Sequence, residues 1–89
     1  MFRLWGKIIK NNNIESDHVF ELSAPELSSD EKLEQGIEGL CYHFDIQVPM
    51  WFASNDSEFK LIGKTRFSAQ HFIEEIRFDT FEIEIVEDK

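Results

Sequence analysis

The sequence has a single cysteine among its 89 residues, so no disulfide can form within the chain. This excludes the small secreted domains that disulfides hold together. The N-terminal stretch MFRLWGKIIK is interrupted by basic side chains and lacks a signal-peptide cleavage site. No apolar run approaches the roughly 20 residues that a membrane span needs. We therefore expect a soluble, cytoplasmic protein that makes no contact with a membrane.

Positive charge is scarce as well. Nine Lys and Arg stand against 18 Asp and Glu, and the net charge is −9. Direct binding of nucleic acid needs a basic surface that neutralises phosphates, so we do not expect it here. The basic residues form two small groups, which are Arg3, Lys7 and Lys10, and Lys60, Lys64 and Arg66. We expect both groups to pair with acidic neighbours within the fold.

Large apolar side chains are what the sequence does supply. Nine Phe and two Trp contribute to a hydrophobic fraction of 42%. A chain of this length is enough for one domain with one modest core, and not for two. It contains no internal repeat, low-complexity tract or linker, so we expect a single domain over residues 1–89.

Residue patterns predict an α+β fold. Residues 2–10 and 14–22 read as two strands joined by the turn Asn11-Asn12-Asn13, and residues 78–87 alternate as another strand. Ser28-Ser29-Asp30-Glu31 has the spacing of a capping box that begins a helix. The helix has one apolar stripe, formed by Leu33, Ile37, Leu40, Cys41 and Phe44. This order predicts an antiparallel sheet of three or more strands with one principal helix packed on one face.

The remaining segments give weaker signals. Gly36 and Gly39 lie three residues apart in the expected helix and would allow a neighbouring element to approach closely. Residues 45–56 contain Pro49 and a polar cluster, and read as a loop. A short helical turn is expected over residues 57–62 and a short helix over residues 68–75.

Three patterns resemble sites of chemistry, and each is incomplete. Gly63-Lys64-Thr65 ends like a phosphate-binding loop, but Glu58 stands where that loop needs another glycine. Cys41, His43 and Asp45 alternate like metal ligands, yet no second Cys/His cluster completes a site. We expect Cys41 to be a small core residue instead.

The third pattern places His71 one helical turn before Glu74 and Glu75. Such a pair could orient an imidazole for proton transfer, but no nucleophile or further ligand accompanies it. We expect a surface His–Glu pair. Taken together, the three patterns predict no catalytic residue, no metal and no cofactor, and a protein that is not an enzyme.

The most informative loop segment is Met50-Trp51-Phe52. Three large apolar side chains follow one another, and consecutive residues cannot all point into a core. Either this loop folds over the sheet and plugs the core, or at least one side chain anchors a partner. Residues 2–10 also leave open whether their apolar side chains are covered within the chain or by a partner. Trp5 and Ile9 face the side of the strand opposite to Phe2, Leu4 and Ile8.

Four segments, spread over most of the chain, carry a resemblance to other proteins. They are Arg3-Leu4-Trp5-Gly6-Lys7, Pro49-Met50-Trp51, Lys64-Thr65-Arg66-Phe67 and Phe72-Ile73-Glu74-Glu75-Ile76. In these segments the chain resembles a family of short uncharacterised bacterial proteins with no assigned activity. The resemblance implies a bacterial, single-domain protein, and it transfers no functional residues.

Two hypotheses of function follow. The first is a small, acidic, non-enzymatic interaction or accessory protein that binds an unknown protein partner, or a second copy of itself, through Trp5, Ile9, Met50, Trp51 and Phe52. The alternative is an acidic inhibitor that imitates nucleic acid and occupies a basic protein groove. Its support is the run from Glu15 to Glu38, which is rich in carboxylates and contains one lysine.

Overall fold

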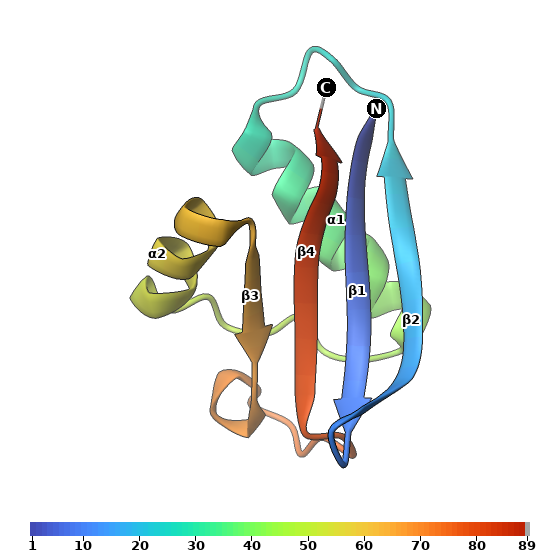
Figure 1. Cartoon of the computed structure of the whole chain (residues 1–89), viewed down its shortest axis with the longest axis vertical. Coiled ribbons are helices and arrows are strands. Elements are labelled where there is room, and N and C mark those ends of the chain that lie inside the picture. The colour runs from blue at the N-terminus through green and yellow to red at the C-terminus, as the bar shows by residue number, and fades with distance from the viewer. Residues whose placement is uncertain (89) are drawn as a thin grey trace.

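The chain folds as a four-stranded antiparallel sheet with its longer helix packed across one face and its shorter helix beside the strand at one edge (Figure 1), seen in a computed structural model that describes residues 1–88. The elements in chain order are β1 (Phe2–Lys10), β2 (Asn13–Leu22), α1 (Ser29–Phe44), α2 (Ala53–Ile62), β3 (Lys64–Phe67), a single 3₁₀ turn (Ala69–His71) and β4 (Thr80–Asp88). The strand order in the sheet is β2-β1-β4-β3. This confirms the α+β class and the antiparallel sheet under one principal helix. No helix in the described residues is long and apolar enough to cross a membrane.

The β1–β2 hairpin forms as the sequence predicts. Asn11 and Asn12 both have positive φ, 54° and 65°, which is the backbone of a type I′ turn. Asparagine tolerates this left-handed conformation better than other residues with a side chain. β1 lies between β2 and β4, as its apolar side chains on both faces indicate.

The start of α1 is set by the predicted capping box. The Ser28 Oγ accepts a hydrogen bond from the Glu31 N–H, and a Glu31 Oε1 accepts one from the Ser28 N–H, both at 3.2 Å. The hydrogen bond from the Ser28 N–H, followed by the interaction with the Ser28 hydroxyl, favours the ionised carboxylate and lowers the pKa of Glu31. The helix ends at Asp45, which takes the left-handed conformation at φ 56°.

Two glycines allow α1 to lie close to the sheet. A methyl group on Gly39 would sit 2.5 Å from Phe20 Cε2 of β2, and one on Gly36 would sit 2.8 Å from Leu4 Cδ2 of β1. Neither position has room for a side chain unless its neighbour moves. The predicted close approach is therefore confirmed, and its partners are the strands of the hairpin.

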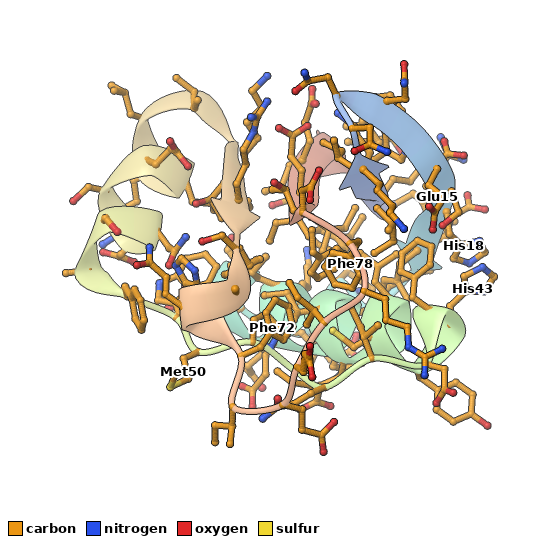
Figure 2. All side chains as sticks on the ribbon, turned by 90° about the horizontal axis from the view of Figure 1, so that it is seen from below. Glu15, His18, His43, Met50, Phe72 and Phe78 are labelled. Carbon is orange, nitrogen blue, oxygen red and sulfur yellow. The ribbon has the colours of Figure 1, made fainter. Side chains whose placement is uncertain are left out.

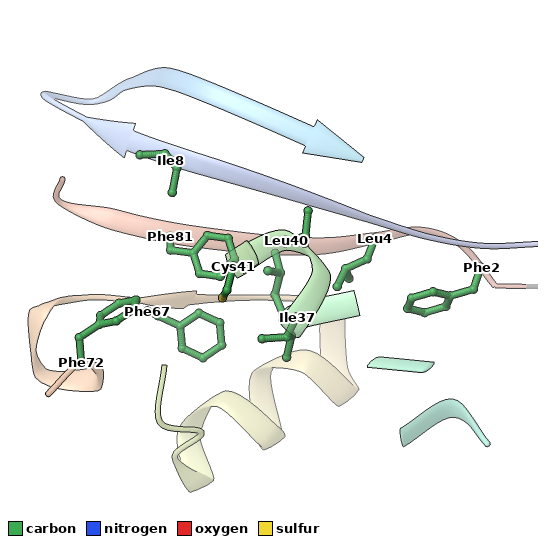
Figure 3. Packing of buried hydrophobic residues seen from close by; sticks show 10 residues of the cluster. Phe2, Leu4, Ile8, Ile37, Leu40, Cys41, Phe67, Phe72 and Phe81 are labelled. Atoms are coloured by element: carbon green, nitrogen blue, oxygen red, sulfur yellow. The ribbon is translucent and has the colours of Figure 1, made fainter. Parts of the chain in front are cut away.

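The core lies between α1 and the sheet (Figure 3). Its buried members come from every strand except β2, from α1 and from the segment after the 3₁₀ turn: Phe2, Leu4, Ile8, Ile37, Leu40, Cys41, Phe67, Phe72, Phe81 and Ile83. The expectation that Cys41 is a core residue is confirmed. Burial, reinforced by the nearby Glu38 carboxylate, raises the pKa of Cys41 to about 12, so the thiol stays protonated at neutral pH.

The segment from residue 53 to residue 75 differs from expectation in three places. α2 begins at Ala53, so the polar cluster read as part of a loop lies inside a helix. Residues 64–67 form β3, a strand that the sequence did not reveal. The helix expected over residues 68–75 is reduced to the 3₁₀ turn, because the N–H groups of Ile73 and Glu74 bind the Gln47 side chain instead of continuing a helix.

Candidate partner-binding groove

The five residues expected to bind a partner lie on two separate parts of the molecule. They are Trp5, Ile9, Met50, Trp51 and Phe52. The first two belong to β1 and point away from α1, since the intervening Gly6 faces Leu40 of that helix. The last three form the segment that leads into α2, on the helix side of the sheet. The structure therefore keeps the two sets apart.

Trp5 lies on the sheet face opposite α1, which we call the open face, within a row of charged side chains. Its indole Nε1 donates a hydrogen bond of 2.8 Å to Asp17 Oδ2 on β2. The ammonium group of Lys7 stands 3.8 Å from the centroid of the Trp5 ring, within the range of a cation–π contact. Trp5 and Ile9 are both half-buried. These contacts occupy both the polar end and one face of the Trp5 ring.

The centre of the open face is an ion-pair network. Lys7 Nζ lies 2.9 Å from Glu82 Oε2 and 3.0 Å from Glu84 Oε1, and Arg66 Nε lies 2.6 Å from Glu82 Oε1. The side chains of Lys7 and Glu82 are only 8% and 5% exposed. Burial by itself would raise the pKa of Glu82, but the hydrogen bonds from Lys7 and Arg66 outweigh burial and lower it. The open face is therefore polar at its centre, with Trp5 at its side.

The expected pairing of the basic groups is confirmed for four of their members. Besides Lys7 and Arg66, Arg3 Nε lies 2.7 Å from Glu21 Oε2, and Lys60 Nζ lies 2.9 Å from Asp56 Oδ2 one helical turn before it.

Met50, Trp51 and Phe52 divide between core and surface. Phe52 turns inward and stacks on the His71 ring with a centroid distance of 4.2 Å. Trp51 packs its ring against Phe59 and Phe67, at 5.8 and 5.9 Å, yet remains 37% exposed. Met50 is 41% exposed and projects away from the core (Figure 2). One side chain is half-buried against His71, and two are presented to solvent.

Asn55 fixes this aromatic segment to the sheet. Its Oδ1 accepts the Phe52 N–H at 2.9 Å, and its Nδ2 donates to Thr65 Oγ1 at 2.8 Å and to the Arg66 carbonyl at 3.0 Å. The residue is only 3% exposed. The Met50 N–H also donates to the His71 carbonyl at 2.7 Å. The backbone on both sides of Trp51 is therefore held in place.

A groove runs between α1 and the segment that carries Trp51, and it encloses about 370 Å³. Its floor and walls are mainly apolar, formed by Leu33, Ile37, Val48, Pro49, Trp51 and Phe67. Four carboxylates stand along it: Asp30, Glu34 and Glu38 on α1, and Asp56 on α2. The three on α1 are four residues apart, so they follow one side of the helix at intervals of about 6 Å.

The charges along this groove are only partly neutralised. Asp56 pairs with Lys60, and Asp30 is close enough to help raise the pKa of Lys60. Glu34 and Glu38 have no ion-pair partner within residues 1–88. The groove thus offers an apolar floor and unpaired negative charge to the same ligand.

Comparisons with protein-family models, with curated proteins and with solved structures find no match to this chain. Its function is therefore inferred from the geometry of its own residues.

The patterns that resembled chemical sites do not assemble. Cys41 points into the core, Asp45 is the C-cap of α1, and the exposed His43 stacks on His18 with ring centroids 3.7 Å apart (Figure 2). Nowhere in residues 1–88 do three or more His, Cys, Asp or Glu side chains gather in a way that could hold a metal ion.

His71 contradicts the expectation of a surface His–Glu pair. It is buried, its Nδ1 accepts the Ser68 N–H at 3.1 Å, and its ring lies between Phe52 and Phe67. Its Nε2 has no hydrogen-bond partner in the described residues. No local pattern indicates this burial, because Phe52, the ring that stacks on His71, comes from the segment before α2.

A larger cavity of about 470 Å³ lies at the C-terminal end of α1, between β2 and the segment before β4. Its lining includes Glu15, Asp45, Glu74 and Glu75 together with Arg77. The groove beside Trp51 is the better candidate site, since it joins an exposed aromatic anchor to an apolar floor.

Proposed function

We propose that this protein is a non-enzymatic interaction module that binds a segment of a partner protein in the groove between α1 and Trp51. The observation that carries the proposal is Trp51 itself. Its ring is packed against two phenylalanines and its backbone is fixed on both sides, yet more than a third of it is exposed. Tryptophans held rigid at the centre of an apolar site are typical anchors of protein interfaces.

The chemistry of the groove selects the kind of segment that fits. The apolar floor suits one or two large aliphatic or aromatic side chains. The carboxylates of Asp30, Glu34 and Glu38 suit Lys or Arg on the same segment. Since they repeat every four residues, an amphipathic helix with basic residues at the same spacing matches them best. The partner is therefore expected to present an amphipathic, basic helix.

A peptide-display selection tests this proposal and does not require the partner to be identified first. The wild-type protein serves as the target, and the Trp51→Ala variant is used only afterwards, to measure how tightly the enriched peptides bind it. Enriched peptides should combine an apolar anchor with Lys or Arg four residues apart. Their binding should shift the amide NMR signals of the groove residues. Trp51→Ala should weaken binding by at least about thirtyfold, the effect of losing roughly 2 kcal/mol at an interface hot spot.

Tyr42→Ala is the matched control, because Tyr42 is an aromatic residue of α1 that is 90% exposed and does not line the groove. It should leave peptide binding unchanged. Peptides that bind Trp51→Ala as tightly as the wild type, or a selection that enriches no basic sequences, would refute the proposal.

A second candidate function is the acidic inhibitor that imitates nucleic acid. Every carboxylate in the run from Glu15 to Glu38 is exposed, which supports this candidate on charge alone. The two candidates differ in their response to salt. The affinity of a nucleic-acid mimic for its basic partner should fall steeply as ionic strength rises. The affinity of a complex anchored by Trp51 should lose only the contribution of the carboxylates along the groove.

The same groove is where self-association is expected, if the protein forms dimers. Trp5 and Ile9 lie beside the buried ion pairs of the open face, and this polar surface is poorly suited to self-pairing. Light scattering after size exclusion, at tens of micromolar protein, measures the oligomeric state directly. A dimer that Trp51→Ala separates would place a second copy in the groove, and a dimer that only Trp5→Glu separates would contradict this assignment.

A further inference from the structure

The two edges of the sheet differ in how they are protected. β3 has four residues, carries Lys64 and Arg66, and packs against α2 (Figure 1). Short length, basic side chains and a covering helix are the usual devices that keep an edge strand from pairing with another chain. β2 at the other edge has ten residues and contains no Lys, Arg or Pro. Its edge is left open by comparison.

The hydrogen-bond pattern between the strands determines which backbone groups of β2 face solvent. The Ile9 carbonyl accepts the Asp79 N–H, so Ile9 directs this group toward the β4 side of β1. The Ile85 N–H binds the Gly63 carbonyl and therefore points away from Leu4, its partner on β1. Odd-numbered residues of β1 thus direct their backbone groups toward β4, and even-numbered ones do not. Even-numbered residues of β1 therefore bind β2.

The register pairs these even-numbered residues of β1 with Ser16, His18 and Phe20. Asp17, Val19 and Glu21 consequently direct their N–H and C=O groups away from the sheet, along its outer edge. All three residues are exposed, and neither helix covers them (Figure 1). They form a row of unpaired donors and acceptors to which a strand could be added.

Charge decides which strand this edge would accept. The side chains of Asp17 and Glu21 flank Val19 on the open face, while Glu15, at the bulge between the Ile8 and Ile9 pairs, lines the cavity at the C-terminal end of α1. Glu21 is already paired with Arg3 of β1, but β2 itself carries three carboxylates and no Lys or Arg, and the net charge is −9, so β2 of one molecule repels β2 of another. A basic strand would gain from the same side chains.

We propose that the outer edge of β2 binds an extended, basic segment of another protein as a fifth strand. In this arrangement the segment pairs its backbone with Asp17, Val19 and Glu21. Basic side chains lie beside the two carboxylates, and a β-branched or apolar side chain lies beside Val19. This site is separate from the groove that contains Trp51, so it stands or falls independently of the proposed function.

The test uses a short peptide, blocked at both ends, in which Lys, Val and Lys stand at every second position with Thr between them, so that all three side chains lie on the face of Asp17, Val19 and Glu21. Binding to the isotope-labelled full chain is followed by NMR. The amide signals of Asn13–Leu22 should shift, and the amide protons of Asp17, Val19 and Glu21 should become protected from exchange. The same peptide with alternate backbone nitrogens methylated should not bind. A peptide with Glu in place of Lys should bind far more weakly.

Val19→Pro removes one outward N–H without removing a bond between β1 and β2, because proline is tolerated on the solvent side of an edge strand. It should weaken the peptide by about three- to tenfold or more, the equivalent of one hydrogen bond. Val19→Thr keeps both the N–H and the β-branched shape and should bind normally. Trp51→Ala should also bind normally, which separates this site from the groove.

Several outcomes would overturn the proposal. One is equal binding of the methylated and unmethylated peptides, which would mean that charge alone attracts them. Another is a dimer that Val19→Pro separates, which would make a second copy the occupant of the edge. If Val19→Pro fails to fold, the methylated peptide still decides the matter on the unaltered protein.

Discussion

Replacing Asn55 with alanine should remove more stability than its position among polar residues suggests. The side chain makes three hydrogen bonds, to the Phe52 N–H, the Thr65 hydroxyl and the Arg66 carbonyl, and it is 3% exposed. Each such bond contributes about 0.5–1.5 kcal/mol net. We therefore expect Asn55→Ala to lower the free energy of unfolding by roughly 3 kcal/mol.

That loss is large for a domain of this size, whose total stability is expected to be about 4–13 kcal/mol. Urea unfolding followed by Trp fluorescence measures this loss of stability. The urea concentration at the midpoint should fall, while the dependence of the unfolding free energy on urea concentration stays constant. In a thermal scan the same loss corresponds to a fall in Tm of roughly 12–24 °C.

Thr65→Val provides the matched control. It keeps the shape of a residue that is 1% exposed and removes one of the three hydrogen bonds, so it should cost about 1 kcal/mol. If Asn55→Ala costs no more than Thr65→Val, the Asn55 amide does not hold the Trp51 segment, and this anchor must be fixed by other contacts.

Two further predictions concern the helix cap and the buried ion pair. Ser28→Ala should destabilise the protein by about 1 kcal/mol, because the Ser28 Oγ accepts the Glu31 N–H. Ser29→Ala should have little effect in the same denaturant titration, and equal effects would mean that the cap lies elsewhere. Folding lowers the pKa of Glu82. Its ionised form therefore stabilises the protein at any pH above the usual Glu pKa of about 4.3. This stabilisation is lost as the pH falls through the lower pKa of the folded state. Glu82→Gln should therefore lower stability at neutral pH and reduce the difference in Tm between about pH 6 and about pH 3; an unchanged difference would show that the carboxylates responsible for the acid sensitivity lie elsewhere.

The elements predicted correctly are those whose signals lie within a few residues of one another. The hairpin depends on Asn11 and Asn12, which adopt the positive φ of its turn. The start of α1 depends on Ser28 and Glu31, three residues apart. The stripe that begins at Leu33 then faces the sheet. Each of these signals is local, so the sequence alone was sufficient.

The elements missed are those that depend on distant residues. β3 exists because Lys64–Phe67 pairs with residues of β4 that lie 14 to 20 positions further on, and four residues give too short a pattern to identify a strand. Asn55 was read as part of a loop because asparagine often bonds to nearby backbone. Here its amide reaches Thr65 and Arg66 across the gap between α2 and β3. No local pattern could have revealed that contact.

The candidate groove shows the same division. Trp51 was identified as a candidate anchor because three large apolar residues cannot all be buried in succession. The carboxylate spacing of Asp30, Glu34 and Glu38 could also have been read from the helix. The sequence could not show that Asp56 and Phe67 complete the groove, because their positions follow from the packing of α2 and β3.

The pairing of β1 with β4 has a consequence for the order in which the chain can fold. These two strands lie side by side at the centre of the sheet, and Phe2 pairs with Asp88. During synthesis the hairpin and α1 emerge first, while the second edge of β1 stays without a partner and Leu4 and Ile8 lack the side chains of β4 that cover them. The core therefore closes only when β4 has left the ribosome, and until then the exposed edge of β1 is a site for mispairing.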